Sequence, residues 1–455
     1  MKKLLIAVCL FPLMSKAQNN DSIFIKKISN EVLLNGKAYD LLKHLTKQIG
    51  ARLAGSEQAT KAEQWGFTTL KNLGADTVFF QECEVPNWKR GNGDAVTIIG
   101  WNNKKVNKPL TALALGNSNG TTAPVVANVL VIESFEELEQ RKDEVKGKIV
   151  YFNAAFNATN IRPFKSYGET GIYRRMGASR AAKYGAVAIM IRSLTEAPDN
   201  YAHTGTMTYN DSFPKIPAVA LGNQDADFIA VEGKKSILQI SLHTHGVMLE
   251  NAIGRNVVAE LKGSENNNQF ITIGGHLDSW DVGEGAHDDG AGIVQTMEVL
   301  RVLKTLGYTP KRTIRFVLFA NEENGLKGGL KYAELAKKNN EQHVFALESD
   351  AGGFTPRGFT CTAPAAKLAA MQAWIKLLQP YGVSEIIVGG GGSDIGPLNK
   401  NFGTPVAGFM PDAQRYFDIH HTKNDVFEAV NKRELLLGAI NMAALIYLVD
   451  SQNIF

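Results

Sequence analysis

Hydrophobic positions divide this chain into stretches with helical and with strand periodicity. Apolar residues three to four apart predict two amphipathic helices between residues 39 and 74, and residues 77–101 have strand character. Short β-branched runs then dominate residues 105–245 and predict further strands. These runs are residues 125–131, 148–151 and 216–221, with one helix at 177–185 that leads into a strand at 186–191.

From about residue 251, apolar strands alternate with helical stretches, as in an α/β sheet. Strands are predicted at residues 257–260, 270–273, 313–319, 344–347 and 405–409. Residues 313–319 are almost continuously apolar, which is typical of a parallel strand covered on both faces. We therefore expect an α/β fold with a mixed, mostly parallel sheet flanked by helices.

The change of pattern also predicts more than one domain. A chain of 455 residues is too long for one simple core. We expect residues 18–104 and 246–455 to form one larger domain, and residues 105–245 to be a β-rich insertion in it.

The N-terminus has the features of a signal peptide. Lys2 and Lys3 precede an apolar stretch at residues 4–14, and residues 15–17 form a small-x-small cleavage site. The apolar stretch is too short to span a membrane, and no later segment is expected to span one. We predict a signal peptide at residues 1–17 and a soluble chain that is secreted or periplasmic.

Charge and cysteine content exclude some classes of protein. The chain is 44% hydrophobic and 21% charged, and its formal net charge is +4. Loss of residues 1–17 removes three lysines and no acid, which lowers that charge to +1. A nearly neutral chain without a basic run is a poor nucleic-acid binder. Only Cys83 and Cys361 would remain, so a single disulfide is permitted but no disulfide framework is indicated.

Histidines and acids gather where the predicted strands end. Residues 274–292 follow the strand at 270–273 and hold two His and four Asp. Other candidate ligands follow the later strands: Glu322, Glu323, Asp350, His420 and His421. In open α/β sheets, ligands bind at the carboxyl ends of strands, so we expect these groups to converge. They are numerous enough for two ions about 3.5–4 Å apart, bridged by Asp288 or Asp289.

Five motifs carry a resemblance to a known family. GGHLDSWDVGEGAHDDGAG, ANEENGLKGG, LESDAGGF, GGGGSDIG and FDIHHTKND are similar to motifs of the co-catalytic zinc aminopeptidase and glutamate carboxypeptidase family. Residues 105–245 resemble that family's inserted protease-associated domain, notably in YRRMGASRAAKYGAVAIMIRS, HTG and KIPAVAL. The resemblance implies a zinc exopeptidase fold with two Zn²⁺ per chain.

The resemblance also implies a role for each matching residue. One zinc ion would be held by His276 and Asp350, the other by Glu323 and His421, with Asp288 as the bridge. His421 is preferred to His420 because the family's ligand precedes a Ser/Thr-x-x-Asp pattern. Asp278 would orient His276. Glu322 would act as general base on a zinc-bound water and pass its proton to the leaving amine.

Other residues are candidates on weaker grounds. Trp280, Ser393, Asp394 and Tyr416 are candidates for substrate binding. Trp280 either lines the substrate pocket or packs beneath its loop, and Ser393 and Asp394 follow a glycine run that could equally be a tight turn. His287 is expected to be a solvent-facing loop histidine, and Arg52 a helix-terminal or salt-bridging arginine.

Three functions fit these features. The first is a zinc exopeptidase that acts on dipeptides or short peptides with free termini, and the second is an aminopeptidase on longer peptides. The third is a binding module that has lost catalysis, but no implied ligand is missing here. The resemblance also implies a homodimer. Residue preference, and which peptide end is recognised, depend on loops that the sequence does not place.

Overall fold

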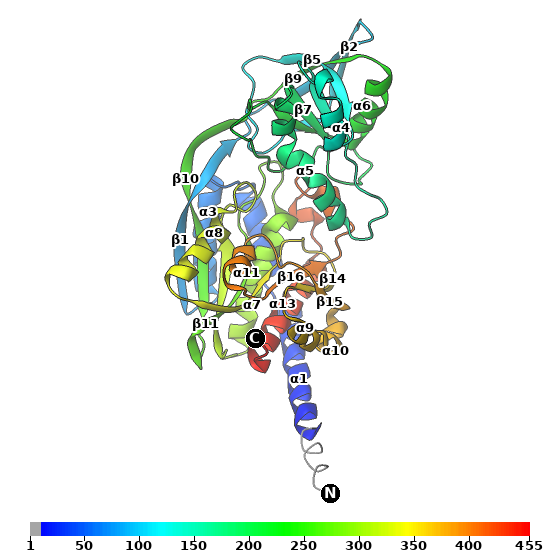
Figure 1. Ribbon diagram of the computed structural model, residues 1–455. Helices are drawn as coiled ribbons and strands as arrows, with labels where there is room; N and C mark the ends of the chain where they lie inside the picture. Colours follow the sequence, from blue (N-terminus) through cyan, green and yellow to red (C-terminus); the bar gives the residue numbers. More distant parts are fainter. Residues whose placement is uncertain (1–10) are drawn as a thin grey trace.

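The computed structural model describes residues 11–455, whose strands form two eight-stranded sheets (Figure 1). In order across the first sheet, the strands are β1 (Thr77–Lys89), β10 (Val247–Leu261), β12 (Arg312–Phe319), β11 (Asn266–His276), β13 (Gln342–Glu348), β16 (Val406–Pro411), β14 (Pro356–Cys361) and β15 (Glu385–Val388). The central strands β12, β11, β13 and β16 are parallel, whereas β1, β10 and β14 run antiparallel to their neighbours toward the centre. The predicted mixed α/β fold is confirmed, as are the five strands predicted after residue 251.

The second sheet is built from residues 95–243. Its strands, in order, are β3 (Lys104–Leu110), β2 (Ala95–Trp101), β9 (Leu238–His243), β5 (Val125–Ile132), β6 (Ile149–Phe152), β7 (Ala188–Arg192), β8 (Ala218–Leu221) and β4 (Ala112–Ala114). Because β2 pairs with β3 and β9, this sheet draws on residues on both sides of position 105. The domain boundaries themselves stay a prediction.

Helices cover both faces of the first sheet. The α-helices that accompany the first sheet are α1 (Phe11–Asn35), α2 (Ala38–His44), α3 (Glu57–Asn72), α7 (Ala291–Thr305), α8 (Lys327–Lys338), α9 (Ala365–Gln372), α10 (Ile375–Leu378), α11 (Gly396–Phe402), α12 (Tyr416–Ile419) and α13 (Lys432–Gln452). Successive side chains of a strand point to opposite faces. Phe316 and Leu318 therefore join the core that includes α1, α7 and α13, while Val317 and Phe319 pack with α8 and α11.

The second sheet is accompanied by α4 (Phe135–Gln140), α5 (Pro163–Ala182) and α6 (Asn223–Lys235). The helix predicted at 177–185 is the last part of α5, which begins at Pro163, fourteen residues earlier. That first part was missed because it is rich in polar residues and glycine. In Figure 1, α5 lies on the side of the second sheet that faces the first.

Helix α13 corrects the expectation that no later segment could span a membrane. Among residues 11–455 it is the one helix that is long and apolar enough by length and composition. However, 83% of its most apolar window is buried inside the protein, where it packs with α1 and α7. A core helix that is covered on most sides needs no polar face, which accounts for its composition.

Two further expectations concern the N-terminus and the cysteines. Residues 1–10 of the predicted signal peptide lie outside the described residues, so the signal peptide stays a prediction. Cys83 in β1 and Cys361 in β14 are both buried and free, so the permitted disulfide is not formed.

Candidate active site

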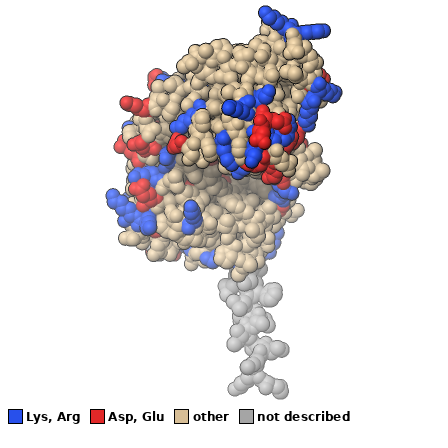
Figure 2. All heavy atoms as spheres, turned by 45° about the horizontal axis from the view of Figure 1, so that its top comes forward, with Lys and Arg blue, Asp and Glu red and all other residues tan. Residues whose placement is uncertain are grey.

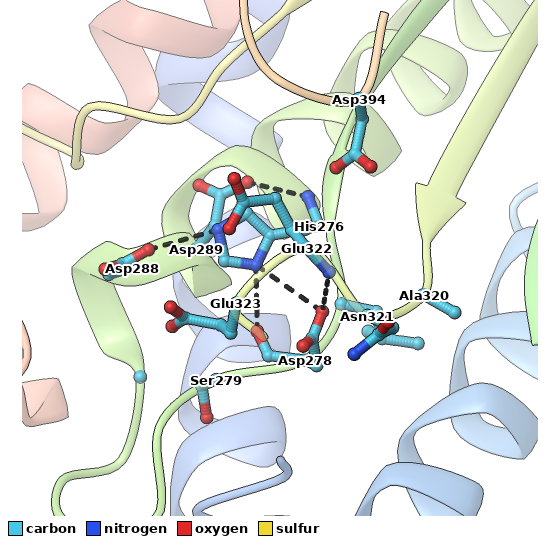
Figure 3. A network of polar contacts seen from close by, with 12 residues as sticks. His276, Asp278, Ser279, Asp288, Asp289, Ala320, Asn321, Glu322, Glu323 and Asp394 are labelled. Atoms are coloured by element: carbon cyan, nitrogen blue, oxygen red, sulfur yellow. Dashed lines mark hydrogen bonds and ion pairs between the residues drawn. The ribbon is translucent and has the colours of Figure 1, made fainter. Parts of the chain in front are cut away.

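Four strands of the first sheet deliver acids and histidines to one place, and Figure 3 shows those that follow β11 and β12. His276 is the last residue of β11, Glu322 and Glu323 follow β12, and Asp350 follows β13. The segment after β16 leads through α12 to His421. This is the convergence that the carboxyl-end rule predicts.

Asp288 lies between the two histidines of this cluster. Its Oδ1 is 3.1 Å from His276 Nε2, and its Oδ2 is 3.0 Å from His421 Nε2. Each histidine also meets a second acid: His276 Nε2 is 3.5 Å from Asp350 Oδ1, and His421 Nε2 is 3.2 Å from Glu323 Oε2. The arrangement therefore has two halves that share one carboxylate.

The loop backbone decides which of the two adjacent aspartates faces the cluster. Asp425 accepts hydrogen bonds from the backbone N–H groups of His287 (2.7 Å) and Asp288 (3.1 Å). Asp289 instead accepts from the N–H groups of His276 (3.1 Å) and Gly292 (3.0 Å), so both its oxygens are used by the backbone. The Asp288–Asp289 peptide bond is cis. Of the two candidates, only Asp288 is placed between the histidines.

Backbone carbonyls fix the orientation of both histidines. Nδ1–H of His276 donates to the Asp278 carbonyl (3.0 Å), and Nδ1–H of His421 donates to the Thr204 carbonyl (3.2 Å). Each hydrogen bond leaves Nε2 free for the cluster. The Asp278 carboxylate is 3.8 Å from His276 Nδ1 and accepts the Glu322 N–H at 2.9 Å. Asp278 thus orients His276 through its carbonyl, while its carboxylate holds the backbone of Glu322.

The two glutamates after β12 point to different surroundings. Asn321 turns the chain with φ 61°, a left-handed conformation that asparagine tolerates well. Glu323 is buried against His421, and its Oε1 has no hydrogen-bond partner. Glu322 is half-buried and lines the adjoining cleft. Glu323 therefore faces the cluster, whereas Glu322 faces the cleft.

Two acids of the cluster, Glu323 and Asp350, are charged only at a cost in free energy. Burial, reinforced by the charge of Asp288, raises the pKa of Glu323 to about 8. Burial also raises the pKa of Asp350 to about 6. A cation would relieve this cost and would give the orphan Glu323 oxygen a partner.

The donor atoms fit a metal of the zinc type. Imidazole nitrogens and carboxylate oxygens are zinc ligands. Ligand atoms of His276, Asp288 and Asp350 lie within 4.8 Å of one another, as do those of Asp288, His420 and His421. His420 stacks on His421, with ring centroids 3.5 Å apart, and its Nε2 is 3.4 Å from Asp288 Oδ2. His421 additionally meets Glu323, which His420 does not.

A cleft of about 1090 Å³ opens above the cluster, and the surface is hollowed between the two sheets (Figure 2). Asp288, Glu322, Glu323, Asp350 and His421 line it, together with residues of α5. Of the four candidates for substrate binding, Ser393 and Tyr416 also line this cleft.

Trp280 and Asp394 do not line this cleft. Trp280 is buried with Leu53 and Trp88, and its ring also meets the His421 ring edge-on, with centroids 5.7 Å apart. Asp394 is fully buried and is not part of the lining of the cleft, although its carboxylate points toward the cluster (Figure 3). Glycine runs reveal a turn but not which neighbouring side chain turns inward.

His287 is not the solvent-facing histidine that was expected. It is 1% exposed, its ring stacks on Phe354 at 4.2 Å, and its Nδ1 accepts the Gly353 N–H. Burial lowers the pKa of His287 to about 4, so the ring is neutral. Loop composition suggested exposure, but the loop folds inward against Phe354.

Arg52 also differs from its prediction as a helix-terminal or salt-bridging residue. Its side chain is fully buried and donates to the carbonyls of Leu277, Glu284 (2.8 Å) and Gly285 (3.0 Å). These hydrogen bonds therefore hold Leu277 at one side of the loop and Glu284 and Gly285 at the other, close to Asp288. Helical periodicity gave no signal of this, because the partners lie more than 220 residues away.

Replacement of Arg52 by methionine should lower the free energy of unfolding by about 3 kcal/mol, because three buried carbonyls lose their partner. Urea unfolding followed by circular dichroism measures this change. The matched control is Arg433→Met at an exposed position, where the change should stay within about 0.5 kcal/mol. Equal stability of the two variants would contradict the conclusion that Arg52 stabilises this loop.

Comparison with known proteins shows which family shares this sequence and fold. The model of peptidase family M28 matches residues 256–446. Human carboxypeptidase Q is 35% identical over 421 residues, covering 91% of this chain and 85% of the relative. The crystal structure of a peptidase M28 precursor from Shewanella amazonensis SB2B superposes with a TM-score of 0.89 at 33% identity, covering 95% of this chain and 97% of that one.

A more distant structure shares the fold. A zinc aminopeptidase from Bacillus subtilis superposes with a TM-score of 0.64 at 20% identity, covering 90% of this chain and 94% of that one. With the cluster of metal-ligand side chains at the carboxyl ends of the strands, and a relative of 35% identity over most of its length, the chain belongs to peptidase family M28 and is a metallopeptidase.

Proposed function

We propose that the chain is an exopeptidase that holds two Zn²⁺ ions and hydrolyses dipeptides or short peptides with free termini. The observation that carries this proposal is the position of Asp288. Its two oxygens face different histidines, and each histidine is paired with a further carboxylate. A bridging carboxylate between two half-sites suits a two-metal centre.

The position of Asp288 divides the proposed ligands into two groups, one for each ion. His276 and Asp350 would hold one ion and Glu323 and His421 the other, with Asp288 shared between them. When bound, zinc supplies Lewis-acid chemistry, which activates water and polarises the peptide carbonyl. Asp278 and Thr204 contribute through their carbonyls, which keep Nε2 of each histidine directed at its ion.

Glu322 is proposed as the general base. Its side chain is half-buried at the floor of the cleft, and the Asp278 carboxylate holds its backbone N–H. From there it accepts a proton from the attacking water and gives it to the leaving amine. Ser393 and Tyr416 form part of the cleft wall along which the peptide lies.

Short substrates are favoured by how the cleft is bounded. Arg162, at the start of α5, forms an ion pair with Glu385 of β15, with Nη2 to Oε2 at 2.8 Å. Gln414 donates to the Ile161 carbonyl at 2.8 Å. These contacts join residues 161 and 162 to the first sheet and its loops at the wall of the cleft. A cleft closed at this wall supports a substrate of few residues.

We expect the zinc-loaded protein to cleave a dipeptide that is free at both ends faster than its N-acetylated form or a longer peptide. A hydrolysis assay with these three substrates, followed by mass spectrometry, tests the proposal. Stepwise removal of N-terminal residues from the longer peptide would favour an aminopeptidase instead. No cleavage of any substrate by protein with two zinc ions bound would contradict the substrate class.

Three further properties are proposed on the sequence features given above. The chain is exported by its signal peptide at residues 1–17 and is secreted or periplasmic. Residues 105–245 form a protease-associated domain, whose α5 supplies one wall of the cleft. The family resemblance supports a homodimer.

A further inference from the structure

Arg90 lies directly after β1, where the chain leaves the first sheet for the second. The residue is 9% exposed, and its guanidinium contacts both parts of the chain. Toward the first sheet, Nε and Nη2 donate to the two carboxylate oxygens of Asp281 at 2.8 and 2.7 Å. Toward the second sheet, Nη1 donates to the Ala114 carbonyl of β4, and Nη2 donates to the Thr204 hydroxyl at 3.2 Å. Arginine suits such a junction because its N–H groups point in several fixed directions.

The partners of Arg90 lead to the proposed metal ligands on both sides. Asp281 lies on the loop between β11 and α7, which also carries Asp288. Thr204 makes two hydrogen bonds with His421. Its N–H donates to the His421 carbonyl at 3.1 Å, and its carbonyl accepts from the His421 ring at 3.2 Å. Arg90 therefore connects the loop of the proposed bridging carboxylate with the residue that orients a ligand of the second ion.

His421 depends on support from outside its own segment. Its backbone has φ 61°, a left-handed conformation that is costly for residues other than glycine and persists only where neighbouring contacts fix it. His276, by comparison, ends a strand of the sheet, and its ring donates to the Asp278 carbonyl in its own loop. His421 lies in a turn after α12, and its two hydrogen bonds to Thr204 come from the segment that forms the second sheet.

Thr204 is attached to the second sheet at several points. The N–H of the preceding residue, His203, donates to Ser193 Oγ at 2.9 Å, directly after β7. The Thr204 hydroxyl donates to the Ala114 carbonyl of β4 at 3.0 Å. A displacement of the second sheet relative to the first would therefore carry Thr204 with it. Arg90 resists that displacement, because it binds both sides at this point.

We infer that Arg90 is a positioning residue for the half-site formed by Glu323 and His421. It joins Asp281 to Thr204 and so keeps the His421 ring directed at the cluster. The segment of the second sheet is then part of the metal centre as well as a wall of the cleft. This inference rests on the proposed two-zinc function and deepens it, because it assigns the support of one half-site to the junction between the sheets.

Arg90→Met should lower the zinc affinity of this half-site alone. Calorimetric titration of the metal-free protein with Zn²⁺ should show two binding steps for the wild type. In Arg90→Met, the dissociation constant of one step should rise by about 10–100-fold, as expected when the support of a ligand is lost, and that of the other should stay within about twofold. In a His421→Ala background the affected step should be missing, and Arg90→Met should change nothing further.

Two more variants and a control make the titration specific. Thr204→Val removes the hydroxyl that contacts Arg90 and keeps the carbonyl that contacts His421, so it should weaken the same step by a smaller factor. Arg90→Lys keeps the charge without the planar fork and should retain part of the affinity. Arg141→Met is the matched control, because Arg141 also combines ion pairs with a hydrogen bond to a carbonyl, that of Val131, but away from the junction. It should bind two zinc ions as tightly as the wild type.

The outcomes separate this inference from the proposed function. Equal weakening of both steps in Arg90→Met would overturn the inference, and so would unchanged titrations of Arg90→Met and Thr204→Val, with the two-zinc proposal left intact. A wild type that binds fewer than two zinc ions would contradict the proposed function instead. Hydrogen exchange of the metal-free protein then still tests Arg90, because the Thr204 N–H should be protected in the wild type and lose most of that protection in Arg90→Met. Undiminished protection would overturn the inference.

Discussion

The Glu322→Gln variant should lose catalysis and keep its metal. We expect kcat/KM to fall by about 10²–10⁴-fold, because glutamine cannot accept the proton of the attacking water. The side chain has nearly the same size, and the Asp278 carboxylate holds the backbone N–H of residue 322, not its side chain. Zinc content and the unfolding midpoint should therefore match those of the wild type.

Two comparison variants make this experiment specific. Glu323→Gln should instead reduce bound zinc, because Glu323 faces His421 inside the cluster. Glu334→Gln on α8 is the matched control, since its side chain is 64% exposed and far from the proposed chemistry. Full activity of Glu322→Gln with two zinc ions bound would refute the general-base assignment, and loss of zinc would make Glu322 a ligand.

The strands and the convergence of the site could be predicted because both depend on local pattern. Residues 313–319 are almost continuously apolar, and they lie in β12 near the centre of the first sheet. Once parallel strands are placed, the groups after them must meet at one edge.

The residues that hold the site in place could not be predicted in this way. Arg52 and Thr204 act on loops more than 200 residues away, and nothing in their own neighbourhoods signals it. Whether a polar loop residue is exposed depends on what packs over it, and for this reason the expectation that His287 faces solvent was wrong. Arg174 lies in a motif that resembles the inserted domain, but nothing in that motif predicted that this residue lines the cleft.

Asp288→Asn should have the second large effect, by removing the charge that the two half-sites share. We expect bound zinc to fall from two ions to one or none and kcat/KM to drop by at least about 10²-fold. Both Asp288 oxygens face histidine nitrogens, at 3.1 and 3.0 Å. An amide offers one oxygen and no charge, so it cannot satisfy both ions.

Elemental analysis after dialysis and thermal unfolding with and without a chelator measure this loss. In the wild type, the chelator should lower the unfolding temperature, because bound metal stabilises only the folded state. In Asp288→Asn that shift should shrink or vanish. Asp211→Asn, whose side chain is 88% exposed, should behave as the wild type. If Asp288→Asn kept two zinc ions and an undiminished chelator shift, Asp288 would not be the bridge. The remaining carboxylates, Asp350 and Glu323, would then have to hold two separate ions, and the two halves of the cluster would be independent sites.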